Sequence, residues 1–557
     1  MQWQLASPQV PQTLDALFAL LATSRGLDTA DMATFFHPPH PTQLTSADVA
    51  IDEAAIEQLK ERLELAKQRK EHVVIFGDYD ADGVCATAVM WEGLRAFGIT
   101  ATPFLPHREK HGYGLSLKAI PDLLAGERPD LVITVDNGIV AHAACQRLMD
   151  EGIDVLITDH HQPEDVLPAA QVIIHSPRLC GTTVSWWVVR QLLGARHETT
   201  QRTLDLTAIA TIADQMPMLG VSRSFVLHGF HALRASSRVG LQLLAEKAQL
   251  ELAELNLEGI NYGIVPRINA MGRLKHGLAA LQLLCTRKRE RAQLLVAELH
   301  DTNTARQELT QEMVAHAMAQ ADSWAHEHVI IVHSPSYHEG VIGLIAGKLT
   351  ESFSKPAIVL AEGDVNAKAS ARSIPGINII ELIREVRADL LEAGGHPMAA
   401  GFGVSLEKLP EVKAKLFALA RVRITTEQLA PKLFVECQLP LSMLTTETAV
   451  AIQQWQPFGQ RNPEPLFALK DLVVLHANTV GRENQHLKLQ VTSAGVAGSP
   501  RAADQAITAM WWGHGERAAT LKPGTLIDLV AKLQRSTWRG RVSLQLVVQD
   551  LHETTSS

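Results

Sequence analysis

The sequence has few cysteines, and no hydrophobic run in it is long enough to cross a membrane. Its five cysteines are scattered through 557 residues without a CxxC pair, which argues against a zinc ribbon and against a disulfide framework. A reducing, cytoplasmic location is therefore the simplest expectation. No run approaches the roughly 20 apolar residues of a membrane span, and no targeting segment is visible, so we expect no membrane association.

Positive charge is scarce as well. The formal net charge is −9, with 51 Lys and Arg against 60 Asp and Glu, and it does not by itself indicate a nucleic-acid partner. From Arg461 onward the balance reverses, because eleven Lys and Arg residues exceed eight Asp and Glu. A mild local excess of this size is only a weak indication of an anionic ligand, so function has to be inferred from motifs.

The length predicts three or four domains, at roughly 100–200 residues per domain. From residue 51, short runs rich in β-branched residues alternate with helical patterns, which predicts a parallel sheet with helices on both faces. The last part contains about five strand patterns separated by Gly, Asn and Pro turns, which predicts an OB-type β-barrel. We therefore expect an α/β protein with two α/β lobes joined by a long helix, followed by this C-terminal barrel. The expected divisions are a lead-in at 1–50, a first lobe at 51–230, a helical connector at 231–328, a second lobe at 329–428 and the barrel at 429–552.

Acidic residues and histidines follow three of the predicted strands. Val73–Phe76 runs into the GDYDADG loop at 77–83, Leu131–Val135 runs into Asp136-Asn137-Gly138, and Val155–Thr158 runs into Asp159-His160-His161. The carboxyl ends of parallel strands meet at one edge of a sheet, where ligand sites form. We therefore expect these side chains to converge.

So many carboxylates in one place raise one another's pKa and destabilise the fold unless a cation is present. Oxygen ligands with one or two imidazoles suit Mn²⁺ or Mg²⁺ better than zinc. Two such ions would activate a water and stabilise the attacking and leaving oxygens of a phosphoester. The pattern predicts a two-metal site for phosphoester cleavage.

Each motif alone has a simpler explanation. A single Asp after a strand is usually a turn or a helix cap, and a HisHis pair is usually part of a surface or a core. The DxDxDG pattern also resembles a calcium loop, but that loop needs a preceding helix and a glutamate where this sequence has Val89. The coincidence of three such motifs on successive strand ends favours the metal site.

These residues resemble the DHH phosphoesterase superfamily, and the order of further motifs along nearly the whole chain resembles its RecJ nucleases. The motifs that carry the likeness are GDYDADG at 77–83, HGYGL at 111–115, VDNG at 135–138, DHH at 159–161, AIATIAD at 208–214, PRINAMGRL at 266–274, HEGVIG at 338–343, SARS at 370–373, GGHPMAAG at 394–401, PFG at 457–459, NPEP at 462–465 and HLK at 486–488.

The resemblance implies an activity and a set of catalytic residues. The activity would be a 5′-to-3′ exonuclease that hydrolyses single-stranded DNA to 5′-mononucleotides in repair and recombination; its polarity and its preference for DNA come from the resemblance alone. His161 would contact the scissile phosphate or orient a ligand, and Asp78 would be a ligand or support one. The implied metal ligands, which with His161 form the catalytic set, are Asp80, Asp82, Asp136, His160 and Asp214.

The motifs also contain candidate substrate-binding residues. Ser370, Arg372 and His396 lie in motifs of the second lobe, where hydroxyl, guanidinium and nearby glycines suit a phosphate. Arg273 is a similar candidate, although it could instead form an ion pair between lobes, and the glycines could simply make a turn. Tyr113 could stack on a base near the cleaved end or pack in the core.

The barrel contributes aromatic and cationic side chains. Neighbouring residues on a strand point to opposite faces, so at most one of Trp511 and Trp512 can face DNA. Trp538, which we expect at a hairpin turn with Arg539 and Gly540, is the better candidate for stacking on a base.

Three segments depart from the family pattern. Ser176-Pro177 stands where Asn-Pro is usual, Thr182–Trp187 replaces a glycine-rich start of a helix, and Ala210 replaces a glycine. None of them removes an expected metal ligand, so the expected reaction class is unchanged. What they alter is the packing beside the site.

Two other functions remain open. The first is a phosphodiesterase for short oligonucleotides or small phosphoesters, against which the added barrel argues. The second is an inactive RecJ-like replication scaffold, against which the retained carboxylates argue. Single-stranded DNA is the expected partner, a single-strand-binding protein and a helicase are partners by analogy only, and we expect a monomer.

Overall fold

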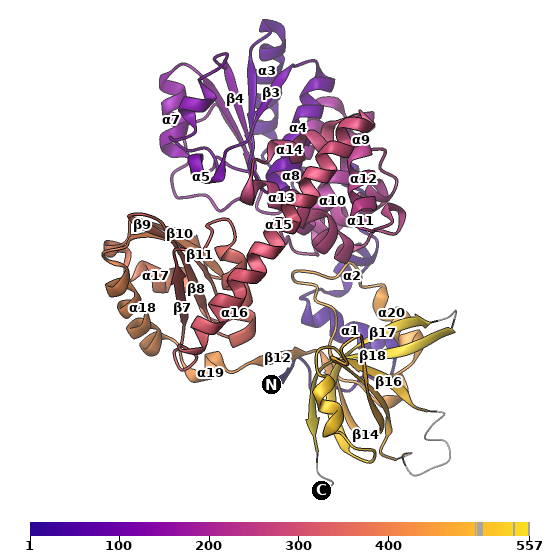
Figure 1. Cartoon of the computed structure of the whole chain (residues 1–557). Helices are drawn as coiled ribbons and strands as arrows, with labels where there is room; N and C mark the ends of the chain where they lie inside the picture. Colours follow the sequence, from indigo (N-terminus) through magenta and orange to yellow (C-terminus); the bar gives the residue numbers. More distant parts are fainter. Residues whose placement is uncertain (496, 498–504, 539–540, 555–557) are drawn as a thin grey trace. The chain divides into compact units, whose positions relative to one another are not determined.

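The computed structural model describes residues 1–495, 497, 505–538 and 541–554 (Figure 1). The chain forms two compact units. Unit 1 consists of Met1–Pro39, Pro217–Ser224 and Lys432–Ser557, and unit 2 consists of His40–Met216 and Phe225–Pro431. Unit 1 is therefore assembled from segments that lie far apart in the sequence, whereas unit 2 is interrupted only by Pro217–Ser224.

Unit 2 begins with a five-stranded parallel sheet. Its strand order is β3-β2-β4-β5-β6, and every pair of neighbours is parallel. The apolar side chains of the strands are buried on both faces, as expected for a sheet sandwiched between helices. The strands are β2 (Val73–Phe76), β3 (Ala101–Phe104), β4 (Leu131–Val135), β5 (Asp154–Asp159) and β6 (Val172–His175).

Helices cover both faces of this sheet. α6 and α7 pack on one face with the side chains of Val74, Val132 and Val155, whereas α4 and α8 pack against each other and against the opposite face. The helices of this region are α3 (Glu53–Arg69), α4 (Ala81–Phe97), α5 (Arg108–His111), α6 (Ile120–Leu123), α7 (His142–Asp150), α8 (Gly181–Leu193), α9 (Glu198–Arg202) and α10 (Leu204–Ala213).

The predicted strands of the first lobe are confirmed, and one expected helix is shorter than predicted. β2 and β4 have the expected bounds, and β5 is one residue longer at each end. The periodicity of residues 115–125 predicts a helix, but only the four residues of α6 are helical. The remaining residues form turns that carry the loop around Tyr113 to the edge of the sheet.

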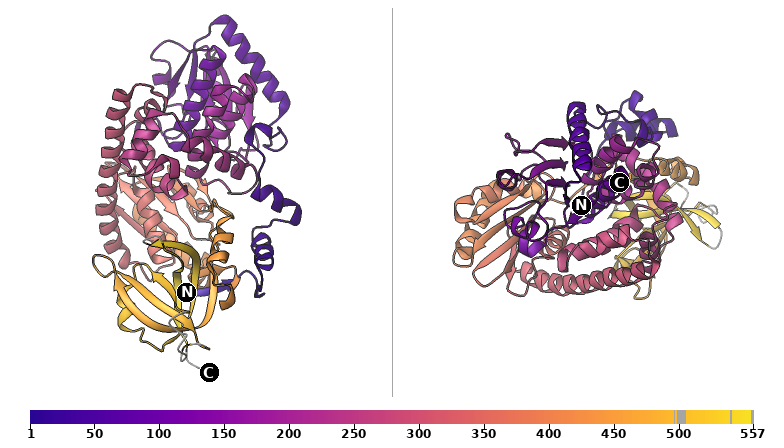
Figure 2. Two further views of the ribbon diagram at one scale, coloured as in Figure 1. Left: turned by 90° about the vertical axis from the view of Figure 1, so that its right-hand side faces the viewer. Right: turned by 90° about the horizontal axis from the view of Figure 1, so that it is seen from above.

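A helical region then leads to the second sheet. Its longest helix, α15, has 34 residues and is roughly 50 Å long (Figures 1 and 2). The expected long connector is thus confirmed, although Thr286–Lys288 separate it from α14. The elements are α11 (Gly220–Arg234), α12 (Val239–Lys247), η2 (Leu252–Glu254), η3 (Gly259–Ile264), α13 (Val265–Leu274), α14 (Leu278–Cys285) and α15 (Arg289–Asp322).

The second sheet is mixed. Its order is β10-β11-β9-β8-β7, in which only β7 and β8 run parallel. α16 packs on one face, and α17 and α18 pack on the other. The strands and helices are β7 (Ile330–Ser334), α16 (Ile342–Phe353), β8 (Ala357–Glu362), β9 (Asn366–Arg372), α17 (Ile379–Arg384), η4 (Arg387–Asp389), β10 (Glu392–His396), β11 (Ala399–Ser405), α18 (Leu409–Arg423) and α19 (Thr426–Leu429).

Unit 1 contains the predicted barrel. Its strand order is β13-β14-β15-β16-β18-β17, and a further pairing of β14 with β17 closes the sheet. Closure removes the free strand edges that an open sheet would expose. The strands are β13 (Cys437–Gln438), β14 (Phe467–Val480), β15 (His486–Ser493), β16 (Ile507–Trp511), β17 (Leu526–Trp538) and β18 (Arg541–Glu553).

The barrel core includes residues from the beginning of the chain. Leu17, Leu21 and Phe35 are buried with Trp455 and the inner side chains of the barrel strands. A short strand, β1 (Gln2–Leu5), also pairs with β12 (Lys432–Val435). The other elements of the unit are α1 (Leu14–Ser24), α2 (Thr29–Phe36), η5 (Leu441–Met443), α20 (Thr446–Gln453) and η6 (Gly515–Ala519).

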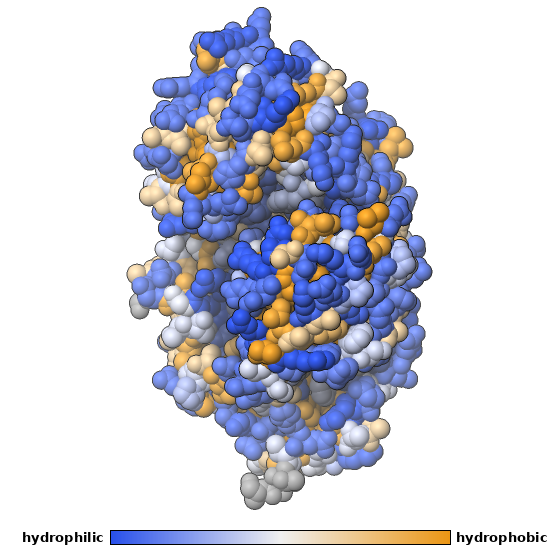
Figure 3. Space-filling view, turned by 90° about the vertical axis from the view of Figure 1, so that its left-hand side faces the viewer, coloured by the Kyte–Doolittle hydropathy of each residue, from blue (hydrophilic) through white to orange (hydrophobic). Residues whose placement is uncertain are grey.

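The described helices do not include one long and apolar enough to span a bilayer. The molecular surface seen in Figure 3 is mostly hydrophilic, with hydrophobic residues in short strips between polar ones. All five cysteines are free thiols, and four of them are buried.

Candidate active site

The first acidic loop follows β2 and begins α4. Asp80 is the N-cap of α4, and its carboxylate accepts a hydrogen bond of 3.0 Å from the backbone N–H of Gly83. Asp78 is fully buried behind it, and a Cβ on Gly83 would lie 2.5 Å from the Cβ of Asp78. Glycine is therefore required at position 83 for the loop to fold back over Asp78.

The second acidic residue, Asp136, has an unusual backbone. It follows β4 with φ of +63°, a left-handed conformation that an L-residue other than Asn or Asp rarely adopts. Its N–H donates to the backbone oxygen of Thr158, which binds the loop to the neighbouring strand. Strain of this kind is typical of residues that are fixed for function.

The three side chains of the DHH motif, at the end of β5, make different contacts. Asp159 accepts hydrogen bonds from the backbone N–H groups of Ile139, His160 and His161, and one of its oxygens lies 2.8 Å from Nδ1 of His161. Its oxygens are therefore occupied by protein donors. His160 instead faces the other carboxylates, with its Nε2 at 3.1 Å from Oδ1 of Asp136.

The carboxylates converge around His160 as the sequence predicts. Nε2 of His160 is 3.9 Å from Oδ2 of Asp82 and 3.7 Å from Oδ2 of Asp214, which caps the end of α10. Oδ1 of Asp136, Nε2 of His160 and Oδ2 of Asp78 are buried without a hydrogen-bond partner. Buried polar atoms are normally satisfied, so these atoms fit a bound cation.

The electrostatics of the cluster lead to the same conclusion. Burial, followed by the charge of Asp80, raises the pKa of Asp78 to about 8, and burial with the charge of Asp82 raises the pKa of Asp214 to about 8. The same two causes hold the pKa of Asp136 well above its ordinary value. Burial lowers the pKa of His160, which keeps its imidazole neutral and able to bind a metal. The cluster therefore holds protons at neutral pH unless divalent cations replace them.

Asp82 is held differently, by the start of α8. Its two carboxylate oxygens accept hydrogen bonds of 2.7 and 2.8 Å from the backbone N–H groups of Gly181 and Thr182. The Thr182 hydroxyl also donates to the backbone oxygen of Asp82 at 2.9 Å. A Cβ on Gly181 would lie 2.3 Å from Oδ1 of Asp136. Glycine is therefore also required at position 181, and the Thr182 that follows it adds a hydroxyl contact to Asp82.

Tyr113 lies beside the cluster. Its side chain is 53% exposed, and its hydroxyl is 2.8 Å from Nε2 of His161. Burial opposes protonation of His161, but the hydrogen bond and the charge of Asp159 outweigh it and raise the pKa of His161 to about 9. His161 therefore carries a proton at neutral pH and presents it on the side of Tyr113.

Three guanidinium groups gather near the carboxylates. Nη1 of Arg273 donates to the backbone oxygen of Gly340 at 3.0 Å, and Nη1 of Arg372 donates to the Ser370 hydroxyl at 3.1 Å. Arg108 lies over the ring of Tyr79. In the described parts of the chain, none of the three arginines forms an ion pair with a carboxylate.

These arginines repel one another. Burial, followed by the charges of Arg108, Arg306 and Arg372, lowers the pKa of Arg273 to about 10. Burial, followed by the charge of Arg108, also lowers the pKa of Arg372. Positive groups crowded without carboxylate partners provide a site for an anion such as phosphate.

The second sheet extends this anion site. Arg372 on β9 pairs with Ala399, which pairs with His396 on β10, so the three residues form one row across the sheet. Side chains directly opposite one another lie on the same face of a sheet. Ser370, two residues from Arg372, shares that face in a row with Gly401 and Gly394, which leaves bare backbone beside the hydroxyl. His396 itself is exposed and lies two strands away from Arg372.

The two neighbouring tryptophans of the barrel differ in exposure, as expected. Trp511 is 7% exposed and belongs to the barrel core, whereas Trp512 is 51% exposed. Trp538 is the last residue of β17 and pairs with Arg541. The side chain of Trp538 and the residues Arg539 and Gly540 lie outside the described part of the structure, so stacking by Trp538 stays a prediction.

Sequence reasoning missed Arg108 and Thr182. Arg108 begins α5, just after β3, at the same edge of the sheet as the acidic loops. A basic residue that follows a strand and precedes the HGYGL motif was an available signal. Thr182 gave no such signal, because its contact depends on how α8 packs against α4.

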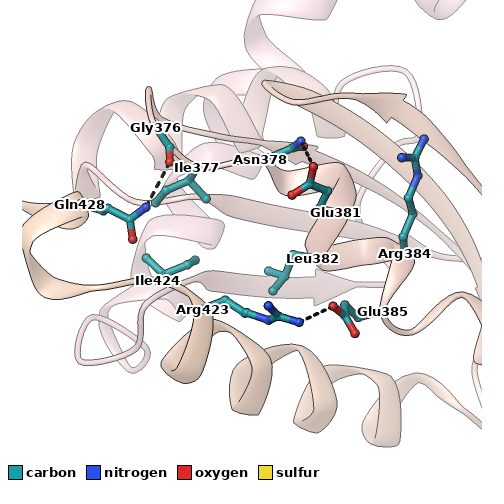
Figure 4. Close-up of a pocket in the computed structure, with 10 residues that line it drawn as sticks. All are labelled: Gly376, Ile377, Asn378, Glu381, Leu382, Arg384, Glu385, Arg423, Ile424 and Gln428. Atoms are coloured by element: carbon teal, nitrogen blue, oxygen red, sulfur yellow. Dashed lines mark hydrogen bonds and ion pairs between the residues drawn. The ribbon is translucent and has the colours of Figure 1, made fainter.

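A cavity of about 660 Å³ on the second lobe is of a different kind (Figure 4). Three of its polar side chains have partners: Arg423 pairs with Glu385, Asn378 donates to Glu381, and Gln428 donates to the backbone oxygen of Gly376. Arg384, which is exposed, also lines this cavity. None of the expected metal ligands or substrate-binding residues lines it.

Comparison with known proteins identifies the class to which this fold and site belong. The family models that match are the DHH family, N-terminal domain, over residues 72–211, and the DHHA1 domain over residues 326–421. A two-lobed protein of the DHH family is thus defined, with its acidic cluster in the first domain and its arginines contributed by both lobes. The RecJ OB domain model matches residues 435–550.

Relatives along the whole chain narrow this class. The single-stranded-DNA-specific exonuclease RecJ of Bacillus subtilis is 30% identical over 99% of this chain and 70% of its own length. The protein of the same name from Escherichia coli is 31% identical over 97% of this chain and 96% of its own. The crystal structure of RecJ from Thermus thermophilus in complex with Mn²⁺ has a TM-score of 0.83 at 29% identity, covering all of this chain and 80% of that one. The chain belongs to the RecJ family.

Proposed function

We propose that the protein is a metal-dependent exonuclease that removes 5′-mononucleotides from the 5′ end of single-stranded DNA. The observation that carries this proposal is the pairing of two unsatisfied charge clusters in unit 2. Buried carboxylates with unpartnered oxygens suit divalent cations, and unpaired arginines suit phosphate. A phosphodiester between the two clusters would be held by its charge and cleaved by the cations.

Mn²⁺ or Mg²⁺ would be held by Asp78, Asp80, Asp82, Asp136, His160 and Asp214. Ligand atoms of Asp82, His160 and Asp214 lie within 4.8 Å of one another, as do those of Asp136 and His160, and Oδ2 of Asp78 is buried without a partner. When bound, the cations supply an activated water and neutralise charge on the phosphate. Crystal structures of the Thermus thermophilus relative contain Mn²⁺ in one case and Mg²⁺ in another, which supports this choice of metals.

The chain's own residues position and polarise the substrate. Asp159 holds His161 in its protonated form, and His161 can donate a hydrogen bond to an oxygen of the scissile phosphate. The exposed ring of Tyr113 offers a surface for the base next to the cleaved bond. Asp159 is better viewed as a positioning residue, because its Oδ1 lies 2.8 Å from Nδ1 of His161 and fixes the orientation of that imidazole.

The arginines provide a reason for 5′ polarity. Arg108, Arg273, Arg372 and the Ser370 hydroxyl form a pocket of donors that suits a terminal phosphate, which has more negative charge than an internal one. A strand anchored there by its 5′-phosphate would present its first phosphodiester to the carboxylate cluster. His396 would contact the strand farther along the second sheet.

The barrel and the retained ligands favour this function over the alternatives. An enzyme for small phosphoesters has no use for a closed OB-type barrel, whereas an exonuclease can use it to hold the strand. An inactive scaffold has no need for six converging metal ligands. We further propose that the protein acts as a monomer in the cytoplasm, alongside a single-strand-binding protein and a helicase; the five free thiols are consistent with that location.

The test is cleavage of single-stranded DNA labelled at the 5′ or the 3′ end, beside matched duplex and RNA, with Mn²⁺ or Mg²⁺. Asp136→Asn is the inactive variant, since asparagine tolerates the left-handed backbone at this position. Asp165→Asn is the matched control on an exposed carboxylate. Labelled mononucleotides from the 5′ end of single-stranded DNA support the proposal. Activity confined to oligomers of a few nucleotides would replace it with the small-substrate function.

A further inference from the structure

A second cavity in unit 2 is surrounded by unpaired positive charge. It has a volume of about 680 Å³ and lies between α12, α13 and the first half of α15. None of the expected metal ligands or phosphate-binding residues lines it. Its lining residues include Lys247, Gln249, Arg267, Gln293 and His300, together with one acid, Glu246.

Arg267 is the central cation of this cavity. Its Nη1 donates to the backbone oxygen of Gly263, and its Nη2 is 3.4 Å from Nδ1 of His300. Its Nε is buried without a partner. Across the described residues, neither Arg267 nor Lys247 forms an ion pair, so the positive charge of the cavity is available to a ligand.

This positive charge continues toward the phosphate-binding arginines. Arg306 lies on α15, which packs against α13, the helix that carries both Arg267 and Arg273. It donates to Asn303, and among the described residues it has no carboxylate partner. Consistent with this placement, burial and the charge of Arg267 lower the pKa of Arg306.

An exposed aromatic residue belongs to a turn that packs next to a residue lining the cavity. Tyr262 is 78% exposed and belongs to η3, a π-helical turn of a kind that often occurs at functional sites. A Cβ on its neighbour Gly263 would lie 2.3 Å from the Leu250 side chain and 3.7 Å from that of Ala248, which lines the cavity. The turn is thus packed against the cavity wall while the tyrosine ring faces solvent.

We propose that this cavity is a second subsite for single-stranded DNA, in which Arg267 binds a backbone phosphate and Tyr262 stacks on a base. Cationic groups that follow the backbone, together with an exposed aromatic ring, are the means by which proteins hold single strands without reading sequence. Arg306 links the subsite to the cleavage site, so one strand can occupy both. The identity of the ligand as single-stranded DNA rests on the proposed function.

The test measures equilibrium binding of fluorescent single-stranded DNA to the full chain in EDTA, which prevents cleavage. The variants are Tyr262→Ala, Lys247→Gln, Arg267→Gln and Arg267→Lys, and Arg384→Gln is the control on an exposed cation of the second lobe. We expect Arg267→Gln and Tyr262→Ala each to weaken binding of a strand of about 20 nucleotides by roughly fivefold to tenfold. Arg267→Gln should also reduce the dependence of log affinity on log salt by about one, whereas Arg267→Lys should preserve it.

A short substrate distinguishes this subsite from the cleavage site. Cleavage of an oligonucleotide of about three residues with Mn²⁺ should be unchanged in Tyr262→Ala and Lys247→Gln, because the metal ligands and phosphate-binding arginines, none of which lines the cavity, suffice to hold so short a strand. Wild-type affinity for the long strand in both Tyr262→Ala and Arg267→Gln would overturn the subsite. If Arg267→Gln lowers the melting temperature, Tyr262→Ala and Lys247→Gln decide the question, since both side chains are exposed. Failure of the proposed function would instead appear as a wild-type protein that releases no 5′ nucleotides.

Discussion

Unit 2 contains two clusters of charged side chains. One consists of carboxylates and the other of arginines. The carboxylates gather at the ends of neighbouring parallel strands, whereas Arg108, Arg273 and Arg372 come from α5, α13 and β9. In each cluster, burial and like-charged neighbours shift the pKa values toward the neutral form. Each cluster is therefore incomplete in the protein alone, and the opposite charge has to come from metal ions in one case and from phosphate in the other.

The clusters differ in how their positions are fixed. The acids are held by short loops, by backbone hydrogen bonds and by helices of the first lobe such as α8, so this lobe by itself determines their geometry. The arginines depend on contacts between the lobes, such as the one from Arg273 to the backbone of Gly340. Substitutions in the acidic cluster should therefore abolish catalysis, and substitutions in the arginine cluster should weaken substrate use in a graded manner.

The largest effect is expected at Asp136. Asp136→Asn should lower kcat by at least about 10³-fold, because it removes a carboxylate that would hold the metals and with it several kcal/mol of transition-state stabilisation. In EDTA at a pH high enough to ionise Asp136, the same substitution should raise the melting temperature, because it removes a buried like charge. Steady-state kinetics and thermal melting measure the two effects. An active Asp136→Asn protein would mean that the acids are structural.

A smaller, substrate-dependent effect is expected at Arg273. Arg273→Gln should reduce kcat/KM for 5′-phosphorylated single-stranded DNA by about 10- to 100-fold, which is the value of a hydrogen bond to a charged group. DNA with a 5′-hydroxyl should be affected much less. Arg384→Gln, an exposed cation of the second lobe, is the control. Equal losses on both DNA ends would show that Arg273 does not bind the terminal phosphate.

The pH dependence of stability tests whether protons or metal ions neutralise the buried carboxylates. Because the folded-state pKa values of Asp78 and Asp214 are raised to about 8, the folded protein binds more protons than the unfolded chain between about pH 4 and 8. In EDTA, stability from these groups is present at low pH and is lost as pH rises through 8. Mn²⁺ should reverse this trend, since it competes with the protons.

Melting temperatures at several pH values, with EDTA and with Mn²⁺, measure this reversal. Asp214→Asn should flatten the decline in EDTA, because asparagine does not titrate. A melting temperature that rises with pH in EDTA would contradict the raised pKa values.

The sequence predicted the site best where the positions of its residues follow from the order and the two-residue period of the strands. The acidic loops were predictable because a parallel sheet brings consecutive strand ends together, and the alternation of Trp511 and Trp512 was predictable because strands have a period of two. Arg108 joins Arg372 only through the packing of two lobes, a relation between distant segments that no local pattern encodes. The contact of Thr182 with Asp82 was hidden for the same reason, since it depends on the packing of α4 against α8.

The smallest effect is expected at Thr182, where the chain departs from its family. Thr182→Val removes the hydroxyl contact to the Asp82 backbone and leaves the N–H contact in place. We expect an increase of several-fold in the Mn²⁺ concentration needed for half-maximal activity, with kcat at saturating Mn²⁺ nearly unchanged. Thr182→Ser should restore the wild-type response, since it keeps the hydroxyl. An unchanged metal response in Thr182→Val would limit this residue to packing.

Unit 1 combines segments from distant parts of the sequence, which determines the order in which the protein can fold during synthesis. Leu17, Leu21 and Phe35 complete a core whose other members follow Lys432, nearly four hundred residues later. At about 10 residues per second, a ribosome needs roughly 40 s to make the intervening chain. The early segment must therefore stay unfolded or protected during that interval, and a fragment that starts at the barrel would expose the apolar surface that this segment covers.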